Sequence, residues 1–272
     1  MLCPFHFARL MESPRQRTPP VFQQTFRFTA LLAVLAFFAG GCGSDSGENG
    51  AGGPAEGPRV VALGGDVTEI VYALGAGGQV VGSDLSSAYP PEVLEKPRLN
   101  YHRQVSAEAV LSLEPDVVLH TDEAGPPTAL DQLRESGVRV VEVPSEETAE
   151  GVAPKIRAVA AAMGMDEAGE ALVAEYESEL AEVREMVAQY EERPGVVFLY
   201  ARQGMGAPMV GGEGSGAEAM IELAGGRNAA RGIEGFKALT PEALLKFEPA
   251  CVRMMDKGCE AIGGEEGGLA IP

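Results

Sequence analysis

Apolar and polar positions along residues 59–143 predict short buried strands that alternate with helices. Four apolar runs that end in polar or glycine-containing turns are expected to be strands: 59–63, 79–82, 116–120 and 139–143. Helical spacing fills the intervals, for example over 128–136. Because strands that alternate with helices form a mainly parallel sheet, the pattern predicts an α/β lobe.

Polar residues mark the helix starts in this pattern. Asp66 with Glu69 three residues later matches a capping box, in which side chains satisfy the free backbone N–H groups. Ser106, Ser215 and Thr240 each precede a later helical run and are expected to cap it.

The pattern changes between residues 152 and 193. Apolar residues recur there at helical spacing with charged residues between them, and Pro194 ends the run. About 25 helical residues would span near 40 Å. We expect one long helix that acts as a stiff backbone between two lobes; the alternative is an ordinary surface helix of the second lobe.

Two signatures occur twice and in the same order, which predicts two related lobes. VSAEAVLSLEPDVVL (105–119) and LTPEALLKFEPACVR (239–253) are identical at six of fifteen positions. Upstream of them, TEIVYALGAGG (68–78) corresponds to AEAMIELAGG (217–226). Two lobes on one plan make a cleft, and clefts are where small ligands bind.

The second lobe has fewer strand signals than the first. Two clear strands are expected over 196–199 and 250–254, with a weak third over 227–230. Of the four cysteines, Cys251 and Cys259 could pair in an oxidising compartment. The favoured interpretation is one cysteine buried in a strand and the other a free thiol in a loop.

The first forty residues predict export. Arginines precede an apolar run of 12 residues, 29–40, whereas a membrane span takes about 20. The run ends at Ala39-Gly40-Gly41-Cys42, which resembles a bacterial lipobox whose Cys42 thiol carries the lipid. We expect a lipoprotein signal peptide over 1–41 and a flexible Gly-rich tether over 42–58. Plain secretion is the alternative.

The charge balance excludes one class of partner. The chain has a formal net charge of −19, and the phosphate backbone of a nucleic acid would repel so acidic a surface. We therefore expect no nucleic acid partner.

These pieces resemble the substrate-binding lipoproteins of bacterial ABC importers for hemin, within a larger group that serves cobalamin and iron siderophores. The matching segments are RVVALGGDVTEIVYALGAGGQVVG (59–82), YHRQVSAEAVLSLEPDVVL (101–119), EAGPPTALDQLRESGVRVVEVP (123–144), PMVGGEGSGAEAMIELAGGRNA (208–229) and LTPEALLKFEP (239–249). The resemblance implies two Rossmann-like α/β lobes, 59–151 and 194–272, joined by a long backbone helix within 152–193. This is the class III periplasmic binding protein fold. The family continues past the position of Pro272, so the second lobe is expected to be truncated.

The resemblance implies that Tyr101 ligates the iron of ferric heme. The chemistry agrees, because ferric iron favours an anionic oxygen ligand and tyrosine is a known axial heme ligand. Arg103, two residues on, would favour the phenolate through its charge and hydrogen bonds. The alternative for Tyr101 is a packing role at the rim of the cleft.

Two histidines are further candidates. His102 could bind iron itself or face solvent. His120 falls at the end of a strand, where α/β clefts open, and is expected to lie near the ligand or behind its contacts. Because only these two histidines follow the leader, a zinc or manganese site of several histidines is not expected.

In the second lobe, Arg202 stands where family members often carry a Ser-His pair. It is expected to pair with a heme propionate. Met205 and Met209, in the Gly-rich segment that follows, could ligate iron or pack on the porphyrin, and packing is the favoured interpretation.

The related cobalamin importers imply a docking role for two glutamates. Glu108 and Glu242 occupy matched positions in the repeat and would enter arginine pockets on the permease. Each also lies in the first turn of a capped helix, where the helix dipole alone favours a carboxylate.

The expected function is an extracytoplasmic, lipid-anchored binding protein that captures ferric heme between its lobes. It would deliver heme to an ABC permease and its ATPase. Cobalamin or a ferric siderophore is the alternative ligand. A metal-dependent enzyme on the two-lobe scaffold is a remote alternative, because the sequence has no Ser-His-Asp arrangement, no P-loop and no cysteine ligand set. We therefore do not expect an enzyme.

Overall fold

The first lobe of this computed structural model is built on a four-stranded sheet, and the structure describes residues 2–5 and 57–264. The strand order is β3-β2-β4-β5, and every pairing is parallel. Its elements are β2 (Val60–Leu63), α1 (Gly65–Ala73), β3 (Val80–Ser83), α2 (Ala107–Leu111), β4 (Val117–His120), α3 (Pro127–Glu135) and β5 (Arg139–Glu142). Short 3-10 helices occupy Gly77–Gln79, Pro91–Glu95 and His102–Gln104. The predicted parallel α/β lobe is confirmed.

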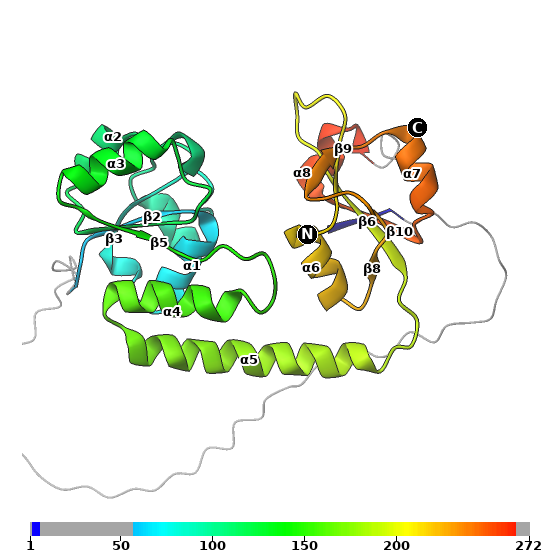
Figure 1. Ribbon diagram of the computed structural model, residues 1–272, viewed down its shortest axis with the longest axis horizontal. Helices are drawn as coiled ribbons and strands as arrows, with labels where there is room; N and C mark the ends of the chain where they lie inside the picture. Colours follow the sequence, from blue (N-terminus) through cyan, green and yellow to red (C-terminus); the bar gives the residue numbers. More distant parts are fainter. Residues whose placement is uncertain (1, 6–56, 265–272) are drawn as a thin grey trace, which may run out of the picture. The chain divides into compact units, whose positions relative to one another are not determined.

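Helices cover both faces of this sheet, which explains the unbroken apolar strands. Val60 and Ala62 pack on one side with residues of α1 and α4 (Val152–Met163), whereas Val61 and Leu63 pack on the other with α2 and α3 (Figure 1). A strand buried on both faces needs apolar residues at every position rather than at alternate ones.

The region 152–193 contains two helices rather than one. α4 ends at Gly164, whose φ of 70° is left-handed and favours glycine. α5 (Asp166–Ala188) then runs for 23 residues and packs against α4. The long helix expected within this region is therefore present as α5, directly before the second lobe, and a shorter helix, α4, precedes it (Figure 1).

The second lobe has a mixed sheet. Its elements are β6 (Gly195–Tyr200), β7 (Met209–Gly211), α6 (Gly216–Leu223), β8 (Arg227–Asn228), β9 (Phe236–Ala238), α7 (Pro241–Phe247), β10 (Cys251–Met255) and α8 (Asp256–Ala261). The sheet order is β1-β10-β6-β7-β9, with β8 paired to β6. β10 and β8 run parallel to β6, but β7 and β9 are antiparallel. β7 and β9 were not among the predicted strands.

One strand of this sheet comes from the segment predicted to be a leader. β1 (Leu2–Phe5) pairs antiparallel with β10. Removal of residues 1–41 would take β1 away and leave β10 as an edge strand. The described residues do not include the rest of that segment. They also leave out Cys42 and all but the last residues of the tether over 42–58.

Three of the predicted helix caps are present. The side-chain oxygens of Ser106, Ser215 and Thr240 accept hydrogen bonds from the N–H groups at the N3 positions of their helices. The capping box at Asp66 was wrong. α1 begins one residue earlier at Gly65, its N-cap Gly64 has a φ of 119°, and Asp66 pairs instead with Lys155. Because α1 starts at Gly65, Asp66 lies inside its first turn and cannot serve as the N-cap.

Among the described residues, Cys251 and Cys259 form no disulfide. Cys251 is half-buried in β10 and Cys259 is buried in α8. The expectation that the second thiol lies in a loop was therefore wrong. Within the described part of the chain, no helix combines the length and the apolar character that crossing a bilayer requires.

Candidate functional site

The carboxyl edge of the first lobe's sheet carries a polar cavity of about 410 Å³. Its walls come from the segments that follow β2, β3, β4 and β5, and include Gly64, Ser86, His102, Thr121, Glu123 and Ser145. In parallel sheets, the carboxyl ends of the strands are the usual place for ligands. This edge is therefore the first candidate for a functional site.

Asp84, directly after β3, is a fully buried carboxylate at this edge. It accepts hydrogen bonds from the Gly64 N–H at 3.0 Å, the Ser87 hydroxyl at 2.9 Å, and both the N–H and the hydroxyl of Ser86. Burial by itself would raise the pKa of Asp84, but the hydrogen bonds from Ser86, Gly64 and Ser87 outweigh it and leave the pKa lowered. Asp84 is thus held as an anion.

His102 is anchored on Asp84. Its backbone N–H and its ring Nδ1 each lie 3.1 Å from Asp84 Oδ2. The residue is 6 % exposed, so the alternative in which His102 faces solvent was wrong. Its Nε2 has no hydrogen-bond partner in the described structure and lies 3.6 Å from the nearest carboxylate oxygen, Glu123 Oε2.

Tyr101 packs against His102 and is partly exposed to solvent. Its ring lies against the His102 ring, with centroids 4.1 Å apart and planes tilted by 45°. It is 40 % exposed. The backbone that follows is tied to the neighbouring turn, because the Gly125 N–H donates to the His102 carbonyl and the Val105 N–H donates to the Gly125 carbonyl. An exposed phenol on a fixed loop can reach a ligand.

Arg103 is paired with Glu123 rather than with Tyr101. The Glu123 carboxylate accepts a hydrogen bond from the Arg103 guanidinium, and both side chains are about half exposed. The expected tuning of Tyr101 by Arg103 is thus not formed in this structure. Arg103 is nevertheless only two residues from Tyr101. It could turn toward Tyr101 or a ligand by giving up its ion pair with Glu123.

His120 lies where the sequence predicted, at the end of β4, but it is 1 % exposed. Its Nδ1 lies 2.8 Å from the Thr121 carbonyl oxygen, so Nδ1 donates and Nε2 is left without a partner among the described residues. It is a buried residue of the strand end rather than a contact at the surface of the cavity.

Of the second-lobe candidates, Arg202 and Met205 lie between β6 and β7, and Met209 begins β7. Arg202 is exposed and Met205 and Met209 are half-buried. No hydrogen bond or ion pair of the described residues joins them to the group formed by Tyr101, His102 and Arg103. The structure therefore brings together the three first-lobe residues and leaves the second-lobe ones separate.

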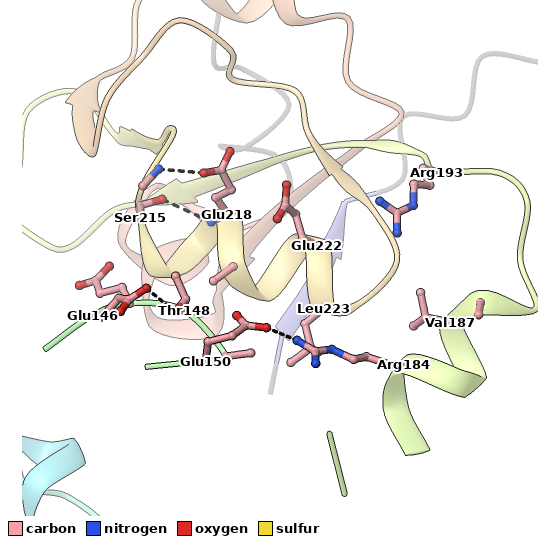
Figure 2. Close-up of a pocket in the computed structure, with 15 residues that line it drawn as sticks. Glu146, Thr148, Glu150, Arg184, Val187, Arg193, Ser215, Glu218, Glu222 and Leu223 are labelled. Carbon is pink, nitrogen blue, oxygen red and sulfur yellow. Dashed lines mark hydrogen bonds and ion pairs between the residues drawn. The ribbon is translucent and has the colours of Figure 1, made fainter. Parts of the chain in front are cut away.

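A larger cavity, of about 660 Å³, lies among the 146–150 segment, the end of α5 and helix α6. Figure 2 shows its side chains: Glu146, Glu150, Glu218 and Glu222 line it together with Arg184 and Arg193. Glu150 already pairs with Arg184. Because acidic groups outnumber basic ones, this cavity suits an anionic ligand poorly, and its size alone does not make it the functional site.

Glu108 and Glu242 are both exposed in the first turns of α2 and α7. Their repeat-related positions are therefore preserved in the structure. Two residues that matter most to the site were not among the candidates. Asp84 directly follows β3 and Glu123 lies three residues past the end of β4, and a polar residue near the end of a buried strand was the signal available for them.

Sequence and structure comparisons identify the class. The chain belongs to the periplasmic binding protein family, whose pattern matches residues 60–267. Its fold is the class III form of that family, with α/β lobes and a parallel sheet.

Solved heme-binding proteins share this fold. The periplasmic heme-binding protein RhuT from Roseiflexus sp. RS-1 is 41 % identical, with a TM-score of 0.76 over 79 % of this chain and 83 % of that one. The periplasmic heme-binding protein BhuT, solved with two hemes, is 37 % identical, with a TM-score of 0.75 over the same shares. At these identities the likeness extends beyond the fold to sequence.

Curated relatives are more distant. The uncharacterized ABC transporter substrate-binding lipoprotein YvrC of Bacillus subtilis is 29 % identical over 203 residues, 73 % of this chain and 63 % of YvrC. The vitamin B12-binding protein of Vibrio cholerae is 29 % identical over 147 residues, which is 54 % of this chain. The chain spans about half the length of the B12-binding proteins that it matches first.

Proposed function

We propose that this protein captures ferric heme at the carboxyl edge of its first lobe, with the Tyr101 oxygen as axial ligand to the iron. The observation that carries the proposal is the placement of Tyr101, which is 40 % exposed on a loop fixed from below by buried hydrogen bonds. The likeness to RhuT and BhuT, both named as heme-binding proteins, supports heme as the ligand. The protein acts as a binding protein and does no chemistry on the porphyrin.

The chemistry of the site suits ferric iron. Ferric iron is a hard cation that prefers an anionic oxygen, and a phenolate supplies one when the phenol proton leaves to solvent. Arg103 lies two residues away and can turn to the phenolate or to a heme propionate once Glu123 releases it. Arg202, exposed in the second lobe, is proposed to pair with a propionate, and Met205 to pack on the ring. His120 supports the strand end behind the site.

Titration with hemin tests this proposal. The wild-type protein should bind hemin with a shifted Soret band, and Tyr101→Ala should bind at least about 100-fold more weakly, because loss of a ligand exceeds the 10- to 100-fold cost of losing its supporting contacts. Tyr190→Ala is the matched control, since Tyr190 is 72 % exposed at the end of the linking helices. Unchanged hemin affinity and spectrum in Tyr101→Ala would refute the proposal.

Cobalamin or a ferric siderophore is the second candidate ligand, favoured by the vitamin B12-binding relatives. A siderophore brings its own iron ligands, so Tyr101 would be dispensable for it. Parallel titrations with cyanocobalamin and with a ferric hydroxamate separate the candidates. Saturable binding of either that is insensitive to Tyr101→Ala, with no hemin binding, would replace heme as the ligand.

Delivery to an ABC permease and its ATPase follows from the binding-protein role, and we propose Glu108 and Glu242 as the docking contacts. Both carboxylates are exposed and repeat-related, which suits a permease of two subunits. Charge reversal at both positions, Glu108→Lys with Glu242→Lys, should abolish hemin uptake by cells while leaving hemin binding intact. Uptake at the wild-type rate would contradict docking through them.

A lipid anchor at Cys42 is proposed for the N-terminus. The lipobox-like Ala39-Gly40-Gly41-Cys42 and the acidic chain behind it support an anchored protein on the outer side of the membrane. Metabolic labelling with a fatty acid should mark the wild-type protein and not Cys42→Ala. Equal labelling of both proteins would contradict the anchor.

A further inference from the structure

The loop that carries Tyr101 rests on a buried pair, Asp84 and His102, that ligation of iron does not itself require. We propose that Asp84 and His102 are positioning residues that fix the Tyr101 ring for its ligand. This proposal rests on the proposed function of Tyr101 and adds to it the means by which the phenol is held.

The geometry ties both the backbone and the side chain of His102 to one atom. Asp84 Oδ2 lies 3.1 Å from the His102 N–H and 3.1 Å from its ring Nδ1. The first bond fixes the chain immediately after Tyr101, and the second fixes the plane of the imidazole. The Tyr101 ring lies on that imidazole at a centroid distance of 4.1 Å. The orientation of Tyr101 therefore depends on a ring that Asp84 orients.

Asp84 is itself immobilised. Gly64, at the end of β2, donates its N–H to Asp84 Oδ1 at 3.0 Å, and the Ser86 and Ser87 hydroxyls donate at 2.7 and 2.9 Å. The carboxylate is fully buried, so water does not compete for these bonds. A continuous path of hydrogen bonds thus leads from the ends of β2 and β3 to the ring that packs against Tyr101. Functional side chains are held to the required precision by supporting shells of this kind.

The imidazole is held from one side only. The carboxylate of Asp84 accepts, so Nδ1 carries the proton, while the buried Nε2 has no hydrogen-bond partner among the described residues. The nearest carboxylate oxygen at that end, Glu123 Oε2, is 3.6 Å away. The Ser86 hydroxyl also lies 3.3 Å from Nδ1, so both hydrogen-bond contacts of the ring are made at this atom. The Asp84 carboxylate is the shorter and the charged contact, and loss of the Nδ1 donor removes it.

Two substitutions at His102 separate positioning from packing. His102→Leu fills the space but cannot donate to Asp84, whereas His102→Asn can place an amide N–H where Nδ1 was. We expect heme transfer from His102→Leu to apomyoglobin to be about tenfold faster than from wild type, the effect of losing one hydrogen bond to a charged group, and its phenolate-to-iron charge-transfer band to shift. His102→Asn should restore most of both. Wild-type transfer and spectrum in a folded His102→Leu, or equal defects in both variants, would overturn the proposal.

A measurement without heme keeps the proposal testable if heme is not the ligand. Proteins labelled with 3-fluorotyrosine, with the Tyr101 resonance assigned by Tyr101→Phe, report the order of that ring by ¹⁹F NMR. Neither variant has an imidazole, so the ring-current change is the same in both. The Tyr101 line in His102→Leu should differ from wild type in width and temperature dependence, and His102→Asn should lie nearer to wild type. Identical lines in the two variants would refute positioning, whatever ligand Tyr101 serves.

The two proposals fail in different ways. Absence of hemin binding by wild type, or hemin binding unaffected by Tyr101→Phe, removes heme as the ligand and leaves the NMR result to decide positioning. Tyrosine-dependent hemin binding that is indifferent to His102→Leu removes positioning and leaves heme. Melting temperatures of all variants show whether a change in transfer rate comes from global destabilisation.

Discussion

The two lobes share a repeated sequence but bury their sheets differently. All four residues of β2 and β4 in the first lobe are buried, whereas β6 in the second lobe alternates between buried and half-buried positions. Val197 and Leu199 enter the core, while Phe198 and Tyr200 lie on the other face beside Phe236. Within the repeat itself, β4 is fully buried whereas its counterpart β10 has mostly half-buried positions. The repeat thus specifies where helices begin, not how completely each sheet is covered.

The same comparison locates the chemistry outside the repeat. Tyr101 precedes the first copy, and Phe236 stands in the corresponding place before the second. Tyr101 rests on the imidazole of His102, whereas Phe236 lies in the short strand β9 and contacts Phe198 and Tyr200 edge to face. The ligand-facing residue lies in a connection that differs between the lobes, as expected when rigid elements carry variable loops.

The largest expected effect tests the difference in burial. Leu119→Ala, at a fully buried position of β4, should lower the free energy of unfolding by about 2–5 kcal/mol because it leaves a cavity. Phe198→Ala, on the half-buried face of β6, should cost less, about 1–2 kcal/mol. Urea denaturation followed by circular dichroism measures both. Equal losses would contradict the difference between the sheets.

A pH-dependent effect tests Asp84, a fully buried carboxylate with no buried counterpart among the described residues of the second lobe. Asp84→Asn should lower the free energy of unfolding by about 1–3 kcal/mol at pH 7, because buried donors lose a charged acceptor. The folded-state pKa of Asp84 lies below its ordinary value of 3.8, so its stabilisation is present above that value and is lost as pH falls through the folded-state pKa.

The difference between wild type and Asp84→Asn should therefore be constant from pH 5 to 7 and shrink below pH 4. Urea midpoints measured across that range provide the check. A difference that persists unchanged at pH 3 would mean that the charge of Asp84 is not what stabilises the fold.

The helix caps should behave alike in the two lobes. Ser106→Ala and Thr240→Ala each remove a side-chain acceptor from a helix N–H at 3.3 Å, and each should lower the free energy of unfolding by about 1 kcal/mol. Ser112→Ala is a control, since that hydroxyl lies at the other end of α2. A large inequality between the caps would show that the repeat is not energetically symmetric.

The smallest effect concerns the exposed pair at the site. Glu123→Gln removes the carboxylate that holds Arg103 and should strengthen hemin binding, by up to about fivefold, because exposed ion pairs are worth at most about 1 kcal/mol. Glu150→Gln, which breaks the comparable pair with Arg184, should leave hemin binding unchanged. Weaker binding by Glu123→Gln would mean that Glu123 assists the ligand instead of competing with it.

The fold was predictable from local patterns of apolar and polar residues, which do not depend on tertiary contacts. Alternating strands and helices predicted the first lobe, and the repeat predicted the second. It failed where a distant partner decides the outcome. Asp66 fits a capping box locally, but Lys155, 89 residues away, takes its carboxylate. β7 and β9 are only three residues each, too short for a periodic signal.

The site was only partly predictable, again because contacts between residues distant in sequence determine its geometry. The resemblance selected Tyr101 and Arg103 from the residues around them. It could not show that His102 turns inward, because its partner Asp84 is 18 residues away in sequence. Nor could it show that Arg103 pairs with Glu123, 20 residues on. Polar residues at or shortly after the ends of buried strands were the available signal for both carboxylates.

The absorption spectrum of the purified protein after hemin addition tests the central claim most directly. We predict a saturable Soret shift with a phenolate-to-iron charge-transfer band in wild type and in Tyr190→Phe, and loss of that band in Tyr101→Phe. The same charge-transfer band in Tyr101→Phe, or hemin that remains as the free species with wild type, would contradict the account.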